Sequence, residues 1–236
     1  MVPAARVQYG LKRWEHPVIR VIVVDDEQLL RSGLRLILNS AEDIQVVSAC
    51  DDVQALDEIR REVPDVVLLD LRMPQIDGIT ILRRLKSLPR PPAVAMLTTF
   101  DMEAHVAEAL SSGASGFLLK DTNPDDLIHA VRVLAGGGSV LSPAITRTVI
   151  DGYVDAARPA ALARVTTMTV RERDVLELVA QGMSNAEIGR RLFLSAATVK
   201  DHVSAILSKL AVSNRVQAAV IARQAGLPSE VDGTRG

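Results

Sequence analysis

The sequence predicts a doubly wound α/β domain, built on a parallel sheet of five strands and followed by a small all-α domain. The front half alternates short apolar runs with amphipathic stretches, which is typical of buried parallel strands joined by helices. The rear part repeats helix-capping patterns at short intervals. A length of 236 residues favours two domains, and an apolar content of 48% supplies two cores.

Polar side chains follow four of the predicted strands at the point where each apolar run stops. They are Asp25 and Asp26 after the run 21–24, Asp70 after 66–69, Thr98 after 93–97, and Lys120 after 117–119. Because the carboxyl ends of parallel strands meet at one edge of the sheet, we expect these residues to converge. Crowded carboxylates repel one another unless a cation joins them, and an all-oxygen cluster suits Mg²⁺. With a lysine and a hydroxyl to hold anionic oxygens, this edge is suited to carrying a phosphoryl group on an aspartate.

Apolar residues at helical spacing place a helix after each predicted strand. The positions are Leu29, Leu30, Leu34, Ile37 and Leu38, then Leu56 and Ile59, then Ile79, Leu82 and Leu85, then Val106, Ala109 and Leu110. The fifth helix begins with Asn123 as N-cap and Pro124 at the first helical position. It ends at the glycines 136–138, where left-handed backbone is favourable.

Four sequence blocks of this front domain match a known pattern. They are Val-Asp-Asp-Glu at 24–27, Leu-Leu-Asp-Leu-Arg-Met-Pro at 68–74 with Asp77 and Gly78, Leu-Thr-Thr-Phe-Asp at 97–101, and Gly-Ala-Ser-Gly-Phe-Leu-Leu-Lys-Asp at 113–121. In order and spacing they resemble the receiver domains of two-component response regulators, over roughly residues 18–140. The resemblance implies that Asp70 is the phosphoacceptor and that a sensor histidine kinase is the donor. It also implies three further sets of site residues. These are Asp25, Asp26, Asp70 and the backbone carbonyl of Arg72 for Mg²⁺, Thr98 and Lys120 for the phosphoryl oxygens, and Phe117 as an aromatic switch.

Helix caps organise the rear domain. Thr169 with Glu172 and Ser184 with Glu187 fit the capping box, and Ser195 can cap a third helix. The second of these helices is short and turns tightly into the third at 193–194. Apolar residues of the third helix then recur every three or four positions: Val199, Val203, Ile206, Leu207 and Leu210. The pattern predicts a helix-turn-helix.

The third helix also has a polar face, formed by Ala197, Lys200, Asp201, Ser204 and Ser208. The blocks 168–176, 181–188, 195–203 and 206–210 resemble the LuxR-type DNA-binding domain, and a receiver joined to it is the NarL/FixJ architecture. The resemblance implies that Lys200 contacts a base or a phosphate. The other candidate contacts are Ser195, Thr198 and Lys209 for phosphates, Asp201 and Ser204 on the DNA-facing side, and His202, which either contacts a phosphate or packs in the domain.

We expect a flexible leader at 1–17, the receiver domain at 18–140, a linker at 141–165, the LuxR-type domain at 166–228 and a flexible tail at 229–236. Residues 17–140 carry 12 Lys/Arg and 19 Asp/Glu, a net charge of −7, whereas residues 166–225 carry 8 and 5, a net charge of +3. This asymmetry suits a cation site followed by a polyanion site, although +3 also fits ordinary surface variation.

Cys50 is the only cysteine, which excludes an intramolecular disulfide and a cysteine-rich zinc site. No apolar stretch approaches the ~20 residues that span a bilayer. The leader contains Lys12, Arg13 and Trp14 but no apolar signal-peptide core. We therefore expect a cytoplasmic protein without membrane contact.

The expected function is a DNA-binding transcriptional regulator switched by Mg-dependent phosphorylation of Asp70. We expect no enzyme activity beyond slow hydrolysis of the phosphoaspartate. After the third helix, Val216, Ala219, Val220 and Arg223 recur at helical spacing. By family resemblance this last helix pairs two copies on double-stranded DNA, in a homodimer that phosphorylation promotes. Packing onto the core of its own domain is the alternative.

Two other functions would use the same residues. A haloacid-dehalogenase-type phosphatase also forms an aspartyl phosphate, but it needs a second Asp two residues after the nucleophile, where this chain has Arg72. A pseudo-receiver that dimerises constitutively or responds to a small molecule is disfavoured because all the key residues are present.

The sequence departs from the family pattern at three places. Asp121 follows the lysine where many receivers carry proline, which excludes a cis X-Pro bond there. Residues 51–52 lack the glycine often found after the second strand. Asp201 would repel DNA phosphates unless it accepts a hydrogen bond from cytosine N4.

Overall fold

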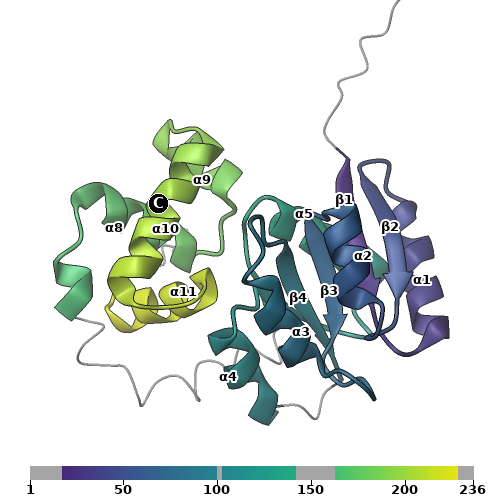
Figure 1. Cartoon of the computed structure of the whole chain (residues 1–236). Helices are drawn as coiled ribbons and strands as arrows, with labels where there is room; N and C mark the ends of the chain where they lie inside the picture. The colour runs from purple at the N-terminus through teal and green to yellow at the C-terminus, as the bar shows by residue number, and fades with distance from the viewer. Residues whose placement is uncertain (1–17, 100–102, 142–162, 228–236) are drawn as a thin grey trace, which may run out of the picture.

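The computed structural model describes residues 18–99, 103–141 and 163–227, which form an α/β domain, the expected receiver domain, and a helical domain (Figure 1). The sheet has the strand order β2-β1-β3-β4-β5-β6, and its neighbouring strands are parallel. The strands are β1 (Ile19–Val24), β2 (Ile44–Cys50), β3 (Val66–Asp70), β4 (Ala93–Thr98), β5 (Gly116–Leu119) and β6 (Val140–Leu141). The predicted doubly wound fold is confirmed.

The sheet has six strands where the sequence predicted five. The additional strand, β6, is two residues long and pairs Val140 with Gly116 and Leu141 with Phe117. A strand this short has no alternation to detect in the sequence. Gly116 allows the close approach, since a Cβ atom there would lie 2.6 Å from the carbonyl oxygen of Val140.

The helices of the receiver domain are α1 (Gln28–Asn39), α2 (Ala55–Glu62), α3 (Gly78–Leu85), α4 (Glu103–Ser111) and α5 (Pro124–Ala135). Buried residues of α1 and α5 pack on one face of the sheet, and those of α2, α3 and α4 pack on the other. Asn123 caps α5 by accepting a hydrogen bond from the Asp126 amide, as predicted. One member of the predicted periodicity of α1 is not in the core, because the Leu29 side chain is 87% exposed.

The helical domain consists of α8 (Val170–Ala180), α9 (Asn185–Leu192), α10 (Ala196–Leu210) and α11 (Arg215–Gln224). Both predicted capping boxes are present, at Thr169 and at Ser184, and Ser195 caps α10. Phe193 forms the turn between α9 and α10 in a left-handed conformation, with a φ of 57°. The predicted helix-turn-helix is therefore confirmed, with α10 in the position of its second helix.

Several predicted segments lie outside the described residues. They are the leader 1–17, most of the linker 141–165, the tail 229–236, and Phe100 and Asp101 after the fourth strand. Within the described ranges, none of the helices has the length and apolar character that crossing a bilayer requires.

Candidate functional site

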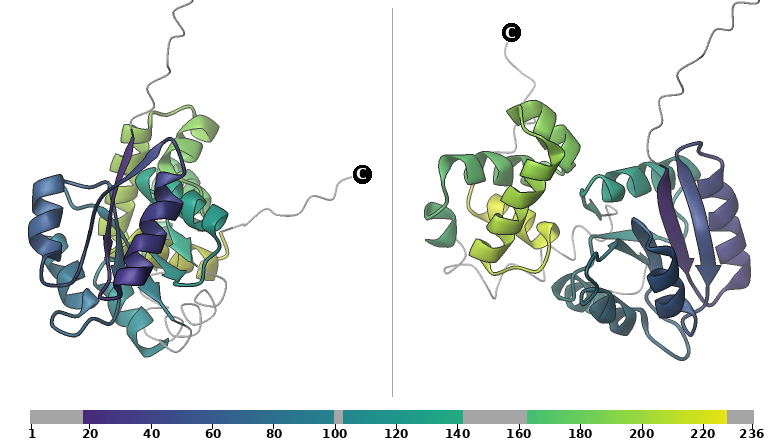
Figure 2. Two further views of the ribbon diagram at one scale, coloured as in Figure 1. Left: turned by 90° about the vertical axis from the view of Figure 1, so that its right-hand side faces the viewer. Right: turned by 45° about the horizontal axis from the view of Figure 1, so that its top comes forward.

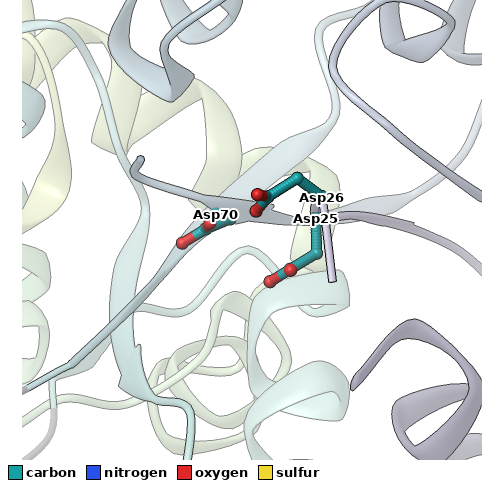
Figure 3. A group of neighbouring side chains, drawn as sticks. All are labelled: Asp25, Asp26 and Asp70. Atoms are coloured by element: carbon teal, nitrogen blue, oxygen red, sulfur yellow. The ribbon is translucent and has the colours of Figure 1, made fainter. Parts of the chain in front are cut away.

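Three carboxylates lie together at the carboxyl edge of the sheet (Figure 3). Asp25 and Asp26 follow β1, and Asp70 is the last residue of the neighbouring strand β3. One oxygen from each side chain lies within 4.8 Å of the others. Asp25 and Asp70 are buried, whereas Asp26 is exposed. The convergence predicted from the strand ends is therefore observed for all three acids.

Lys120 joins this cluster from the end of β5. Its Nζ atom lies 2.9 Å from Asp25 Oδ2, 3.2 Å from Asp70 Oδ2 and 3.2 Å from Glu27 Oε1. The Asp25 contact is an ion pair with a carboxylate that is fully buried. Glu27 is a contact that the sequence analysis did not assign. Its position two residues after Asp25, at the start of α1, was the available signal.

The surroundings of Asp70 make it hold its proton more tightly than an ordinary aspartate does. Burial, reinforced by the nearby charge of Asp25 and opposed by Lys120, raises the pKa of Asp70 from 3.8 to about 6. Burial alone would lower the pKa of Lys120, but its contacts with Asp25, Asp70 and Glu27 outweigh that cost and raise it. The single Lys120 ammonium contacts three carboxylates, so it balances only part of the negative charge of the site.

The donor set fits a hard divalent cation. Carboxylate oxygens are the preferred protein ligands of Mg²⁺. Asp25 Oδ2 is buried, and apart from its ion pair with Lys120 it has no partner among the described groups, so ligand capacity remains at this atom. The exposed side chain of Asp26 completes the group on the solvent side.

The loop after Asp70 is held against the site by two groups. A Cβ atom on Gly78 would lie 2.1 Å from the carbonyl oxygen of Asp70, so only glycine lets α3 begin here. Buried Asp52 accepts hydrogen bonds from the amides of Gln75 and Ile76 at 2.8 and 2.6 Å. Asp52 is thus an anchor of the loop, which the sequence analysis recorded only as a missing glycine.

The remaining predicted receiver residues occupy two environments. Thr98 ends β4, is 2% exposed, and donates from Oγ1 to the Thr99 carbonyl at 3.0 Å. Phe117 lies on the neighbouring strand with its ring fully buried. Arg72 is exposed beside Asp26 in a cleft that also includes Asp77. The metal role of the Arg72 carbonyl stays a prediction.

The helical domain presents the predicted polar face of α10 at its surface. Lys200, Asp201 and Ser204 are exposed, and His202 is half-buried. The hydroxyls of Ser195 and Thr198 lie 2.8 Å apart at the start of the helix. The predicted contact Lys209 is engaged within the domain, because its Nζ atom donates to Glu172 Oε2 at 2.7 Å.

The two domains touch through the start of α11. Asn214 Nδ2 donates to the carbonyl of Leu110 at 2.6 Å, and Ser213 Oγ donates to the carbonyl of Ser111 at 3.0 Å. Both acceptors are at the carboxyl end of α4, and buried Val216 packs into the same core cluster as α4. In a parallel α/β sheet this helix end lies at the edge opposite the strand ends that carry Asp70.

A buried arginine makes the second contact between the domains. Arg215 is 7% exposed and donates to the carbonyls of Gly137 and Met183 and to Asn185 Oδ1. Burial lowers its pKa to about 10. Gly136 and Gly137 belong to the receiver domain, so Arg215 ties the turn after α5 to the helical domain.

A cleft remains between the two domains beside these contacts. Lys200 and Ser204 of α10 line it from one side, and Lys86 and Arg90 of the α3–β4 connection line it from the other. The second view in Figure 2 shows α10 on the side of the helical domain that faces the receiver. Lys200 and Ser204 therefore face the receiver across this cleft and remain exposed in it.

Comparison with known proteins matches both domains. Residues 21–132 match the family model "response regulator receiver domain", and residues 166–222 match "bacterial regulatory proteins, luxR family". The chain is 38% identical to the nitrate/nitrite response regulator protein NarL of Escherichia coli (strain K12), over 86% of this chain and 94% of NarL.

Two solved structures resemble the chain over most of its length. The response regulator ChrA of a heme-sensing two-component system is 37% identical, with a TM-score of 0.50, over 90% of this chain and 100% of ChrA. A structure of two RcsB dimers bound to two parallel DNAs is 25% identical, with a TM-score of 0.51, over 88% of this chain and 98% of RcsB.

Proposed function

The chain belongs to the two-component response regulators that join a receiver domain to a LuxR-type DNA-binding domain, and on that premise we propose that phosphorylation of Asp70 controls its binding to DNA. The observation that carries the proposal is the meeting of Asp25, Asp26, Asp70 and Lys120 at one edge of the sheet. The donor is the phosphohistidine of a sensor kinase, and the protein acts in the cytoplasm, where its DNA is.

In the transfer step, an oxygen of Asp70 attacks the phosphorus of the phosphohistidine. The new P–O bond forms as the P–N bond breaks, and the imidazole nitrogen leaves with the bonding electron pair. Asp70 must be ionised to attack, and the neighbouring Lys120 charge favours that form. Lys120 then keeps contact with the added phosphoryl oxygens, and the Thr98 hydroxyl turns from the Thr99 carbonyl to donate to them.

Mg²⁺ bound here would neutralise phosphoryl charge and draw the donor oxygens toward Asp70. Asp25, Asp26, Asp70 and the carbonyl of Arg72 would hold it. The protein's own part is to fix the carboxylates in place, through the β1–β3 pairing and the loop that Asp52 anchors.

Helix α4 connects the phosphorylation site to the interdomain contact. Its amino end follows the segment after Thr98, and its carboxyl end carries the Leu110 and Ser111 carbonyls that bind Asn214 and Ser213. We propose that rotation of Thr98 and repacking around Phe117 shift α4, which weakens these hydrogen bonds. Phosphorylation can favour release only by the difference in its stabilisation of the open and closed states.

Release of the receiver frees α10 to enter the major groove, with Lys200 as the principal contact. Two copies are needed, because one helix-turn-helix reads only one half-site. We propose that the two copies pair through α11. In the arrangement described here Val216 and Val220 of α11 pack against the receiver core, so release of the receiver would also free this face for a second copy.

A phosphatase that turns over a substrate through an aspartyl phosphate would need a second Asp two positions after Asp70. That position holds the exposed Arg72, which supplies no carboxylic acid. We therefore propose a switch whose phosphoaspartate hydrolyses slowly, and not an enzyme.

The test is the intact mass of the protein after incubation with acetyl phosphate and Mg²⁺. We expect one added phosphoryl group on the wild type and none on Asp70→Asn, which is nearly isosteric. Gain of a phosphoryl group by Asp70→Asn would refute the site. Absence of any gain in the wild type would favour a pseudo-receiver.

A further inference from the structure

Four cationic side chains line the interdomain cleft from opposite sides. Lys86 and Arg90 come from the receiver, and Lys200 and Arg215 come from the helical domain. Over the described ranges, none of the four forms an ion pair with a carboxylate. Like charges that face each other across a cleft oppose its closure.

The cleft offers little negative charge to offset them. Asp65 is the carboxylate in its lining, and one of its oxygens already accepts the Arg20 amide at 2.8 Å. Arg215 donates its hydrogen bonds to two carbonyls and an amide oxygen, which bring no charge, and the carboxylate whose charge acts on it, Glu187, is not part of the lining. The cleft therefore carries an excess of about three positive charges, counted over its lining residues at neutral pH.

Among the described residues, two polar groups of the lining lack a partner that an anion could provide. The Ser139 hydroxyl lines the cleft and is buried without a hydrogen-bond partner in the part of the chain that the structure describes. The Lys86 side chain is exposed but lies beside Gly113, and its partial desolvation lowers its pKa. A bound anion would supply the charge and the acceptor that these groups lack.

We propose that the cleft binds a small anion carrying two or more linked phosphate groups, and that the bound anion holds the two domains closed. Lysine and arginine side chains are strong hydrogen-bond donors to phosphate oxygens, and the negative charge of a polyphosphate matches the excess positive charge of the cleft. Because Lys200 then contacts the anion, Lys200 is not available to bind DNA while the domains are closed. This last consequence rests on the proposed function, whereas anion binding itself does not.

The test uses unphosphorylated full-length protein in buffer containing EDTA, so that metal at the acidic site plays no part. Pyrophosphate is titrated calorimetrically into the wild type, with orthophosphate as the comparison. We expect saturable binding of pyrophosphate, about tenfold or more tighter than orthophosphate. The double variant Lys86→Ala, Arg90→Ala should lose about tenfold or more in affinity. Arg84→Ala is the matched control, because Arg84 is an exposed cation at the end of α3, two residues before Lys86 and outside the cleft.

The wild type should also lose DNA affinity in pyrophosphate beyond the loss in sodium chloride of equal ionic strength, and the double variant should respond to both salts alike. Absence of saturable pyrophosphate binding, or equal affinity in the wild type and the double variant, overturns the proposal. Circular dichroism confirms that the variants are folded. Failure of the proposed function would appear separately, as absence of phosphorylation on Asp70 in the mass measurement.

Discussion

Replacement of Asp70 by asparagine should stabilise the metal-free protein, because it removes a buried charge from the acidic cluster. Asp70 is 4% exposed, and burial together with Asp25 raises its pKa from 3.8 to about 6. The folded state therefore holds the Asp70 proton more tightly than the unfolded state does. As pH rises through this range the wild type loses stability that the Asp70→Asn variant does not lose.

The size of the effect follows from the two pKa values. Full ionisation of Asp70 costs the folded state about 3 kcal/mol at pH 8, and about 1 kcal/mol at pH 4.5, where ionisation is incomplete. Asp70→Asn should therefore gain about 3 kcal/mol at pH 8 and roughly 1 kcal/mol at pH 4.5. The contact with Lys120 is already included, since it opposes the rise of the Asp70 pKa.

The assay is urea denaturation followed by circular dichroism, in EDTA, at pH values between 4.5 and 8. Asp57→Asn is the control, because the Asp57 side chain is 88% exposed and lies 3.5 Å from Arg60. It should change the free energy of unfolding by less than about 0.5 kcal/mol at each pH. A gain for Asp70→Asn that does not change with pH, or a loss at pH 8, would refute the electrostatic account of the cluster.

Three other substitutions test separate parts of the structure. Gly78→Ala should abolish phosphorylation and destabilise the protein by about 2 kcal/mol or more, measured by mass and by urea denaturation, because its Cβ atom would meet the Asp70 carbonyl at 2.1 Å. Lys200→Ala should weaken DNA binding and reduce the log–log salt slope by about 0.9 if it contacts a phosphate; an unchanged affinity and slope would remove it from the interface. Phe193→Gly should raise stability by about 1 kcal/mol, because Phe193 has a φ of 57° and is 95% exposed, so left-handed strain is relieved without loss of packing. A loss of stability would show that the Phe193 ring makes contacts of its own.

The site at the carboxyl edge could be predicted because it depends on local patterns. Each apolar run ends where its strand ends, and parallel strands present those ends on one edge, so Asp25, Asp70 and Lys120 had to meet. The helix caps at Thr169 and Ser184 are local in the same way. The sixth strand escaped prediction, since two residues are too few to show a period.

The contacts between the domains could not be predicted from the sequence. Asn214 has the ordinary features of an N-cap, and it caps α11 while also binding the Leu110 carbonyl 104 positions away. Val216 has the spacing of a domain-core residue, yet it packs with the core of the receiver. A periodic pattern shows that a side chain is buried, but not which surface buries it. Leu29 is the opposite case, since it has helical spacing and faces solvent.

The affinity for promoter DNA before and after phosphorylation tests the central claim most directly. One preparation is divided, one half is phosphorylated with acetyl phosphate and Mg²⁺, and the added mass is confirmed before both halves bind the same DNA at one salt concentration. The account predicts tighter binding by the phosphorylated half, and equal binding by the two halves of an Asp70→Asn preparation treated alike. Equal affinity of the phosphorylated and unphosphorylated wild type would contradict it.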